Sequence, residues 1–400
     1  MKSYRLIMYF LFTFMAGFTY TALVYLNMWE PLKIGFQTLP WWVYILTFLV
    51  AFYVALSIHE LAHFISFKIQ GIHLRAIYIT IFVFYKTDQG WSFTINPKLW
   101  ILFGGLVIPD LDEITSDAKF DHNIHAFAVS LISAPLATIF YALLLFISFF
   151  VSLVYATGPI YLTIFCIFTM FTMIISLIYV RSFSISTQNI FGDFVAFDKV
   201  RKDPVFQLVQ LIQYQKFSLK HHHFNPYLFE EASWMISRQQ TLKPNMFMLS
   251  IISYYLEGVN YYNMSVHDGA DKMIKSLNIR AFKKDELGLM CSYELATYYY
   301  HTDQLDKSYQ IYSLISKFNY KNVDEKLLIY LKNKYEHITH LEDHEPFLTD
   351  LSNVYIDHLW LFDKIINPYD QIDVMHKKQP YKVYECLVTI REDELEREMI

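Results

Sequence analysis

The chain has 400 residues, which is enough for two domains, and it is 54% hydrophobic and only 18% charged. A soluble globular domain normally carries about 25% charged residues, so this composition favours residence in a membrane. The formal net charge is -5 and the sequence has no basic stripe, which excludes an electrostatic case for nucleic-acid binding.

Cysteine usage argues against a disulfide framework and against a cysteine-based zinc site. The three cysteines, Cys166, Cys291 and Cys386, form neither an even set nor a CxxC pair. We therefore expect buried, reduced thiols.

Apolar segments long enough to cross a bilayer occupy the first half of the chain. The first, residues 6–26, follows Lys2 and Arg5 and has no small-residue cleavage site, so we expect a retained span and not a cleaved signal peptide. The other expected spans are residues 41–67, 124–154 and 159–180.

Basic residues near the span ends set the expected orientation. With four spans, Lys33 alone falls on one side of the membrane. The opposite side receives Lys2, Arg5, Lys68, Arg75, Lys98, Lys119, Arg181, Lys199, Arg201 and Lys202. We therefore expect a multi-pass protein of the cell membrane with both termini in the cytoplasm and His59 near the cytoplasmic end of the second span.

The segment between the second and third spans does not have the pattern of a clean helix. Residues 76–85 (AIYITIFVFY) and 91–95 (WSFTI) are rich in β-branched and aromatic residues, and residues 86–90 have turn chemistry. This pattern predicts a β-hairpin. Residues 99–109 are apolar but too short to span and are interrupted by Gly104 and Gly105, so we expect a re-entrant or interfacial segment.

The motif His59-Glu60-Leu61-Ala62-His63 lies late in the second span. Histidines four residues apart on a helix project from one face and can share a metal ion, and Glu60 can act as a general base for water. A catalytic zinc ion needs three protein ligands and an open position. Ionisable residues inside an apolar span are costly and therefore point to function. The alternative is a span that ends early, with the motif merely flanking it at the cytoplasmic surface.

At this point the chain resembles the site-two protease family of intramembrane zinc metalloproteases. The resemblance covers roughly residues 41–200 and includes LSIHELAHF (residues 56–64), the hairpin and the Gly-containing apolar segment. It also includes ISAPLATIF (residues 132–140), which is similar to the family's small-Gly-Pro-Leu-Ala-Asn stretch. Pro135 is retained, while Ala134 replaces the family's Gly and Thr138 replaces its Asn.

The resemblance implies that an Asp after a later span completes the zinc site with His59 and His63. In the family this Asp lies in an Asn-Leu-x-Pro…Leu-Asp-Gly motif, and the corresponding residue here is Asp193 in STQNIFGDFVAFDKV (residues 186–200). The sequence departs from the motif: its Pro is absent, Gly192 precedes the Asp in place of Leu, and Phe194 follows it in place of Gly. Asp198, a little over one helical turn further on, is the alternative third ligand.

Further polar clusters have simpler interpretations. We interpret Asp110, Asp112, His122 and His125 as a solvated loop and helix start ahead of the third span. We interpret His221, His222 and His223 as a solvated loop, because consecutive histidines lack helical spacing.

Residues 204–400 contain amphipathic, helix-length segments and no Gly-rich nucleotide loop. Residues 293–318 resemble a tetratricopeptide-type helical hairpin, with Ala296 and Ser308 as small packing positions. Residues 246–262, 268–277 and 325–341 predict further helices, and the tail from residue 381 is also expected to be helical. The alternative is an irregular helical bundle.

The predicted fold is an all-α polytopic membrane protein with about four transmembrane helices, a small β-hairpin and re-entrant segment, and a C-terminal soluble α-helical domain. We expect a membrane-embedded metalloprotease domain at residues 1–203 and a cytoplasmic helical domain at residues 204–400. The expected function is zinc-dependent cleavage of a membrane-embedded or membrane-delivered peptide near the cytoplasmic face, with Zn²⁺ held by His59, His63 and Asp193 and Glu60 as the catalytic base.

The expected partners are a peptide or membrane-protein substrate, the lipid bilayer and a protein that binds the helical domain. The alternative function is a non-catalytic membrane protein, for binding, immunity or peptide export, that works through its helical domain.

Overall fold

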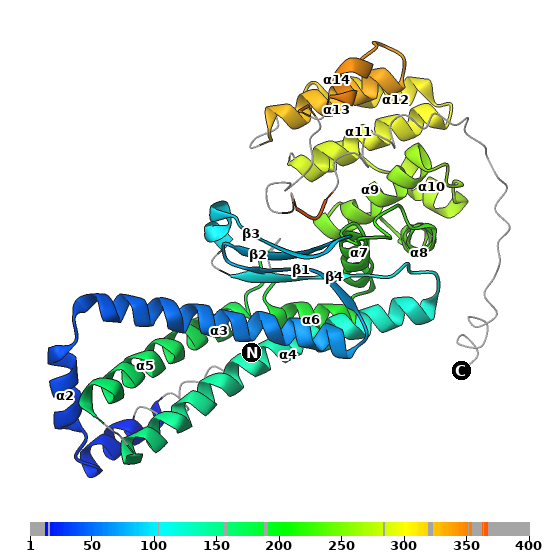
Figure 1. Cartoon of the computed structure of the whole chain (residues 1–400). Helices are drawn as coiled ribbons and strands as arrows, with labels where there is room; N and C mark the ends of the chain where they lie inside the picture. The colour runs from blue at the N-terminus through cyan, green and yellow to red at the C-terminus, as the bar shows by residue number, and fades with distance from the viewer. Residues whose placement is uncertain are drawn as a thin grey trace, which may run out of the picture. The chain divides into compact units, whose positions relative to one another are not determined.

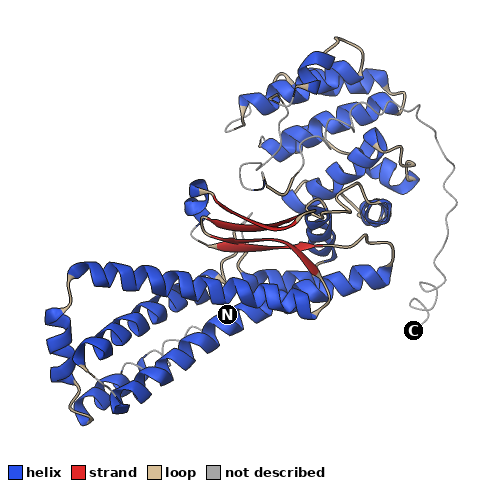
Figure 2. Cartoon of the chain, viewed as in Figure 1, coloured by secondary structure: helices blue, strands red, loops and turns tan. Residues whose placement is uncertain are grey.

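The computed structural model describes residues 13–14, 17–102, 104–155, 158–187, 191–282, 285–318, 323–350, 352–353, 362 and 364–366. The chain forms two compact units. The first comprises Met1–Phe84, Phe93–Val107 and Ala126–Asp198, and the second comprises Tyr85–Ser92, Ile108–His125 and Lys199–Ile400. Most described residues are helical, with one small sheet (Figure 2).

Three described helices are long and apolar enough to cross a membrane (Figure 1). They are α3 (Trp41–Ile69), α4 (Asp117–Tyr155) and α5 (Pro159–Ser182), at the positions of the second, third and fourth expected spans. Of the expected first span, residues 6–12 and 15–16 lie outside the described residues, and residues 17–25 are helical. A shorter helix, α2 (Trp29–Thr38), precedes α3 and was not expected.

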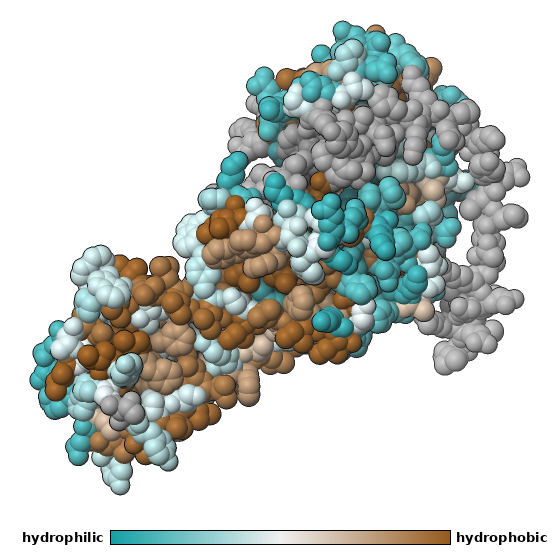
Figure 3. All heavy atoms as spheres, in the orientation of Figure 1, coloured by the Kyte–Doolittle hydropathy of each residue, from teal (hydrophilic) through white to brown (hydrophobic). Residues whose placement is uncertain are grey.

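Small residues let α3 and α5 pack closely. Ala51 and Ala55 of α3 are fully buried against Ile175 of α5, as expected where helices associate through close backbone approach. Large apolar side chains such as Phe48, Ile65 and Ile147 remain exposed on these helices, and hydrophobic residues cover much of this surface in Figure 3. An exposed apolar surface of this extent suits contact with lipid.

The predicted hairpin is instead part of a four-stranded sheet of order β3-β2-β1-β4. The run expected as one strand, residues 76–85, contains the end of β1 (His73–Ile79) and most of β2 (Phe82–Thr87). The chain reverses at Thr80, which has a positive φ of +49 degrees, and the Thr80 amide donates to the Gly104 carbonyl (3.0 Å). A β-branched residue rarely adopts positive φ, so the sequence gives no sign of this turn. The second expected strand is β3 (Gly90–Ile95).

The prediction of a re-entrant or interfacial apolar segment at residues 99–109 did not anticipate the strand found there. These residues form the end of a 3-10 helix, η1 (Pro97–Leu102), and most of β4 (Gly105–Asp110), an edge strand beside β1. The segment is apolar because Val107 and Ile108 are buried. Pro109 is tolerated because an edge strand can lack one backbone donor.

The second unit is built from short helices that follow one another along the chain. They are α6 (Asp193–Lys202), α7 (Pro204–Gln215), α8 (Pro226–Ser237), α9 (Met246–Tyr261), α10 (Asp268–Lys275), α11 (Glu286–His301), α12 (Leu305–Ile315), α13 (Glu325–Ile338) and α14 (Glu345–Thr349), with α6 divided between the units. Asp203, Asn225 and Asn245 cap three of them by accepting bonds from backbone amides in the first turn. Local sequence therefore determines many of the helix starts.

Helices α11 and α12 pack through the small residues singled out from the sequence. Ala296 and Ser308 are fully buried, and the Ser308 hydroxyl donates to the Ala296 carbonyl (2.8 Å).

Cys166 and Cys291 are buried and free, while Cys386 lies outside the described residues. Burial raises the pKa of the Cys291 thiol, which keeps it protonated and unreactive.

Candidate metal centre

Helix α3 places His59 and His63 on one face, as their spacing of four residues requires. Their rings meet edge to face with centroids 4.9 Å apart. His59 is buried and His63 is partly buried, so both imidazoles lie inside the first unit and not on a solvated helix end.

Asp193 approaches the two histidines from the start of α6. Its Oδ2 atom lies 3.1 Å from Nε2 of His59 and 3.7 Å from Nε2 of His63. Burial alone would raise the pKa of Asp193, but hydrogen bonds and charge interactions with the two histidines lower it below its ordinary value. The carboxylate is therefore ionised and available as a ligand.

Gly192 explains how the chain brings Asp193 to this position. The Gly192 amide donates to the Ile185 carbonyl (2.9 Å), and the Phe194 amide donates to the Phe183 carbonyl (3.0 Å). These bonds fold the chain back onto the end of α5. A Cβ atom on Gly192 would lie 2.2 Å from the Ser182 carbonyl oxygen, so only glycine fits. The departure from the family motif at this position thus has a structural reason.

Two hydroxyl groups on α4 orient the histidines from behind. Nδ1 of His59 lies 3.0 Å from the Thr138 hydroxyl, and Nδ1 of His63 lies 3.0 Å from the Ser130 hydroxyl. Thr138 donates its own proton to the Ala134 carbonyl (3.0 Å), so it can accept the Nδ1 proton of His59. That arrangement leaves Nε2 free to bind a metal. A hydrogen-bond partner on the other ring nitrogen commonly fixes a ligating histidine in this way.

Glu60 lies beside the histidines with its carboxyl group in the protein interior. The residue is 3% exposed, and its Oε2 atom has no hydrogen-bond partner among the described residues. Strand β4 passes directly against it, because a Cβ atom on Gly105 would lie 2.4 Å from the Glu60 carboxyl carbon. Glycine at this position of β4 is therefore what leaves room for the Glu60 side chain.

Aromatic residues at the end of α5 cover the His59 ring, and sequence reasoning did not single them out. Phe183 stacks on His59 with centroids 4.9 Å apart and planes 8 degrees apart. Tyr179, one turn earlier on α5, has its ring centroid 6.4 Å from that of His59. Nothing in the sequence distinguishes these aromatics from the many others in the apolar spans.

The alternative third ligand and the other polar clusters lie outside this group. Asp198 is exposed on α6, and the metal-binding group found there among the described residues contains Asp193 instead. Asp110 accepts bonds from the Ser218 hydroxyl (3.1 Å) and the Leu219 amide (2.8 Å), which gives it a structural role within the second unit. His122 and His125 are exposed on α4, and residues 221–223 lie in a loop.

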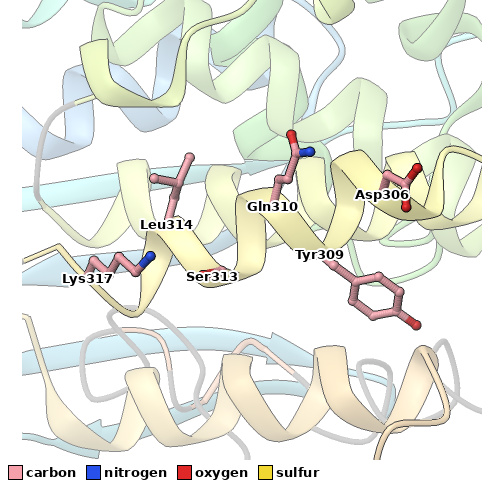
Figure 4. Close-up of a pocket in the computed structure, with 6 residues that line it drawn as sticks. All are labelled: Asp306, Tyr309, Gln310, Ser313, Leu314 and Lys317. Carbon is pink, nitrogen blue, oxygen red and sulfur yellow. The ribbon is translucent and has the colours of Figure 1, made fainter.

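Two other features of the second unit carry no chemistry that we can assign. Glu336, Glu342 and His344 form another group that could hold a metal, but Tyr312 and His344 already bond the Glu336 carboxylate. A surface pocket on α12 contains no metal-binding group or nucleophile paired with a base (Figure 4). It is lined by Asp306, Tyr309, Gln310, Ser313, Leu314 and Lys317.

The arrangement around His59 fits a zinc ion. The ligand atoms of His59, His63 and Asp193 lie within 4.8 Å of one another. Ligands at about 2.0–2.2 Å from a tetrahedral ion are separated by roughly 3.4 Å, close to the spacing seen here. Two imidazoles and one carboxylate make a common catalytic zinc ligand set, and the unpartnered carboxyl oxygen of Glu60 is available beside it.

Helices apolar enough to span a membrane, together with a histidine pair, a carboxylate and a buried glutamate, are the features of a membrane metalloprotease. The chain belongs to peptidase family M50, the site-2 protease family, whose profile matches residues 47–331. Members of this family are membrane zinc metalloproteases. Comparison with curated proteins and with solved structures gives no match.

Proposed function

We propose that this protein is an intramembrane zinc endopeptidase that cleaves a membrane-embedded or membrane-delivered peptide near the cytoplasmic face. One observation carries the proposal: His59, His63 and Asp193 converge inside the first unit, next to the buried carboxyl group of Glu60, whose Oε2 atom has no hydrogen-bond partner among the described residues. In this proposal His59, His63 and Asp193 hold the ion, and Glu60 acts as general base and then as general acid.

In this proposal each side chain of the site has a separate role in hydrolysis. A bound zinc ion supplies Lewis-acid chemistry for activating water and polarising a peptide carbonyl. Thr138 and Ser130 fix the orientation of the two histidines through their Nδ1 atoms. Glu60 accepts one proton from water and delivers it to the leaving nitrogen. Phe183 shields His59 from bulk water by stacking on its ring.

Metal removal tests the proposal directly. We expect the purified full-length chain to contain one zinc ion and to cleave at least one fluorogenic peptide from a panel of apolar sequences. Treatment with a chelator should stop cleavage, and added zinc should restore it, because His59 and His63 cannot activate water by themselves. His63→Ala should lose both zinc and activity. A wild-type chain that cleaves equally well after complete zinc removal would contradict the proposal.

We also propose that residues 1–203 form the membrane protease domain and that residues 204–400 form a cytoplasmic helical domain that recruits the substrate or a regulator. The positions of basic residues support the orientation, since Lys68 and Arg181 lie in the last turns of α3 and α5. The paired helices α11 and α12 support the recruiting role, because arrays of helical hairpins present surfaces that hold peptides.

A reporter fused after Ile400 tests this orientation. We expect a reporter that is active only in the cytoplasm to be active in this fusion, because the basic residues favour a cytoplasmic C-terminus. The matched control is a reporter that is active only outside the cytoplasm, fused at the same residue, which should be silent. The reverse pattern would overturn both the orientation and the recruiting role.

A further inference from the structure

The hydroxyl group of Tyr179 is buried and has no hydrogen-bond partner among the described residues. Tyr179 lies on α5, one turn before Phe183, and its ring centroid is 6.3 Å from that of Phe183 and 6.4 Å from that of His59. A buried hydroxyl without a partner is costly, and native structures seldom leave one without a reason.

A second unpartnered group belongs to the same site. Glu60 is the neighbour in α3 of His59, whose ring centroid is 6.4 Å from that of Tyr179, and the Glu60 Oε2 atom also lacks a hydrogen-bond partner among the described residues. One group is a hydrogen-bond donor and the other is an acceptor. Both lie beside the residues that would hold the metal, so a ligand with complementary groups would satisfy them together. Water offers a proton to Glu60, and a peptide carbonyl offers an acceptor to Tyr179.

We propose that Tyr179 is a further catalytic residue whose hydroxyl donates a hydrogen bond to the carbonyl oxygen of the scissile peptide bond. The inference rests on the proposed peptidase function and assigns one more group to the same site. During hydrolysis the oxygen of water bonds to the carbonyl carbon, and the carbonyl oxygen gains negative charge. The carbon–nitrogen bond then breaks, and one proton of the water passes through Glu60 to the leaving nitrogen.

A preorganised donor aimed at the developing negative charge is worth most in a site that excludes water. Tyr179 meets this condition, because its hydroxyl is buried within an apolar span. Its ring packs against the cluster of Ala51, Ala55 and Ile175, which fixes the direction of the hydroxyl. A tyrosine held only for packing would not need the hydroxyl, and phenylalanine would serve equally well.

The test compares Tyr179→Phe with Tyr141→Phe, because both tyrosines pack against the same cluster. Phenylalanine keeps the ring and removes only the hydroxyl. We expect Tyr179→Phe to lower kcat about 10²–10³-fold, the effect of losing one such donor, with KM and zinc content unchanged. Tyr141→Phe should retain wild-type kcat.

A binding measurement gives a readout that does not depend on turnover. A phosphinic peptide resembles the tetrahedral species, and its affinity should fall in Tyr179→Phe. The affinity of the uncleaved peptide is measured in a Glu60→Gln background, and there Tyr179→Phe should leave it unchanged. The inference is overturned if Tyr179→Phe keeps its kcat, loses its zinc, or binds the phosphinic peptide as tightly as the wild type does. A wild-type chain that binds zinc but cleaves no peptide would instead overturn the proposed function itself.

Discussion

Replacing Glu60 by Gln should abolish proteolysis and leave zinc bound. Glutamine has the size and shape of glutamate, so it fits the space that Gly105 leaves beside the side chain. It cannot accept a proton from water at neutral pH, and loss of a general base lowers turnover by about 10²–10⁴-fold. Glu60 is not one of the three groups whose ligand atoms converge, so zinc content should match that of the wild type.

The measurement pairs zinc content with cleavage of a fluorogenic peptide by the same detergent-solubilised sample. Glu30→Gln is a suitable control, because Glu30 belongs to the same unit and its side chain is 71% exposed on α2. That variant should keep both zinc and activity. Cleavage by zinc-loaded Glu60→Gln at the wild-type rate would falsify the assignment of Glu60 as the base. A wild-type chain that binds zinc but never cleaves would favour the non-catalytic alternative.

The features that depend on local sequence were predictable. Apolar length alone locates α3, α4 and α5, and the spacing of His59 and His63 places both on one helix face. Thr138 could also be found, because it occupies the position of the family's Asn, and the structure places its hydroxyl against His59. Ser130 lies two helical turns before Thr138 on the same face of α4, so the same periodicity could have indicated it.

The features that depend on long-range contact were not predictable. Thr80 adopts a positive φ of +49 degrees because its amide and hydroxyl find partners in Gly104 and Tyr53, and neither partner is visible from the local sequence. The sequence of β4 also fits a short apolar membrane segment, and only its pairing with β1 identifies it as a strand. Tyr179 and Phe183 acquire their significance only from proximity to His59, which α5 reaches by packing along α3.

The choice between Asp193 and Asp198 is also a question of long-range geometry. The sequence offers two carboxylates about one helical turn apart, and periodicity cannot separate them because either could face the metal. Backbone hydrogen bonds of Gly192 and Phe194 to the chain at the end of α5 hold Asp193 beside the histidines, and this placement is the reason for proposing Asp193 as the ligand. Asp198 is exposed further along α6.

The Asp193→Ala variant should therefore lose most of its zinc, and Asp198→Ala should keep it. Removing a hydrogen-bond partner of a metal ligand typically lowers metal affinity about 10–100-fold, so removing a ligand itself should lower it at least as much. The fold around residue 193 should persist, because the Gly192 and Phe194 bonds are made by backbone atoms. Metal analysis after dialysis against a zinc buffer, with a check that both variants remain monodisperse and helical, measures the difference. Zinc loss in Asp198→Ala alone would identify Asp198 as the ligand, and the convergence of Asp193 on His59 would then need another explanation.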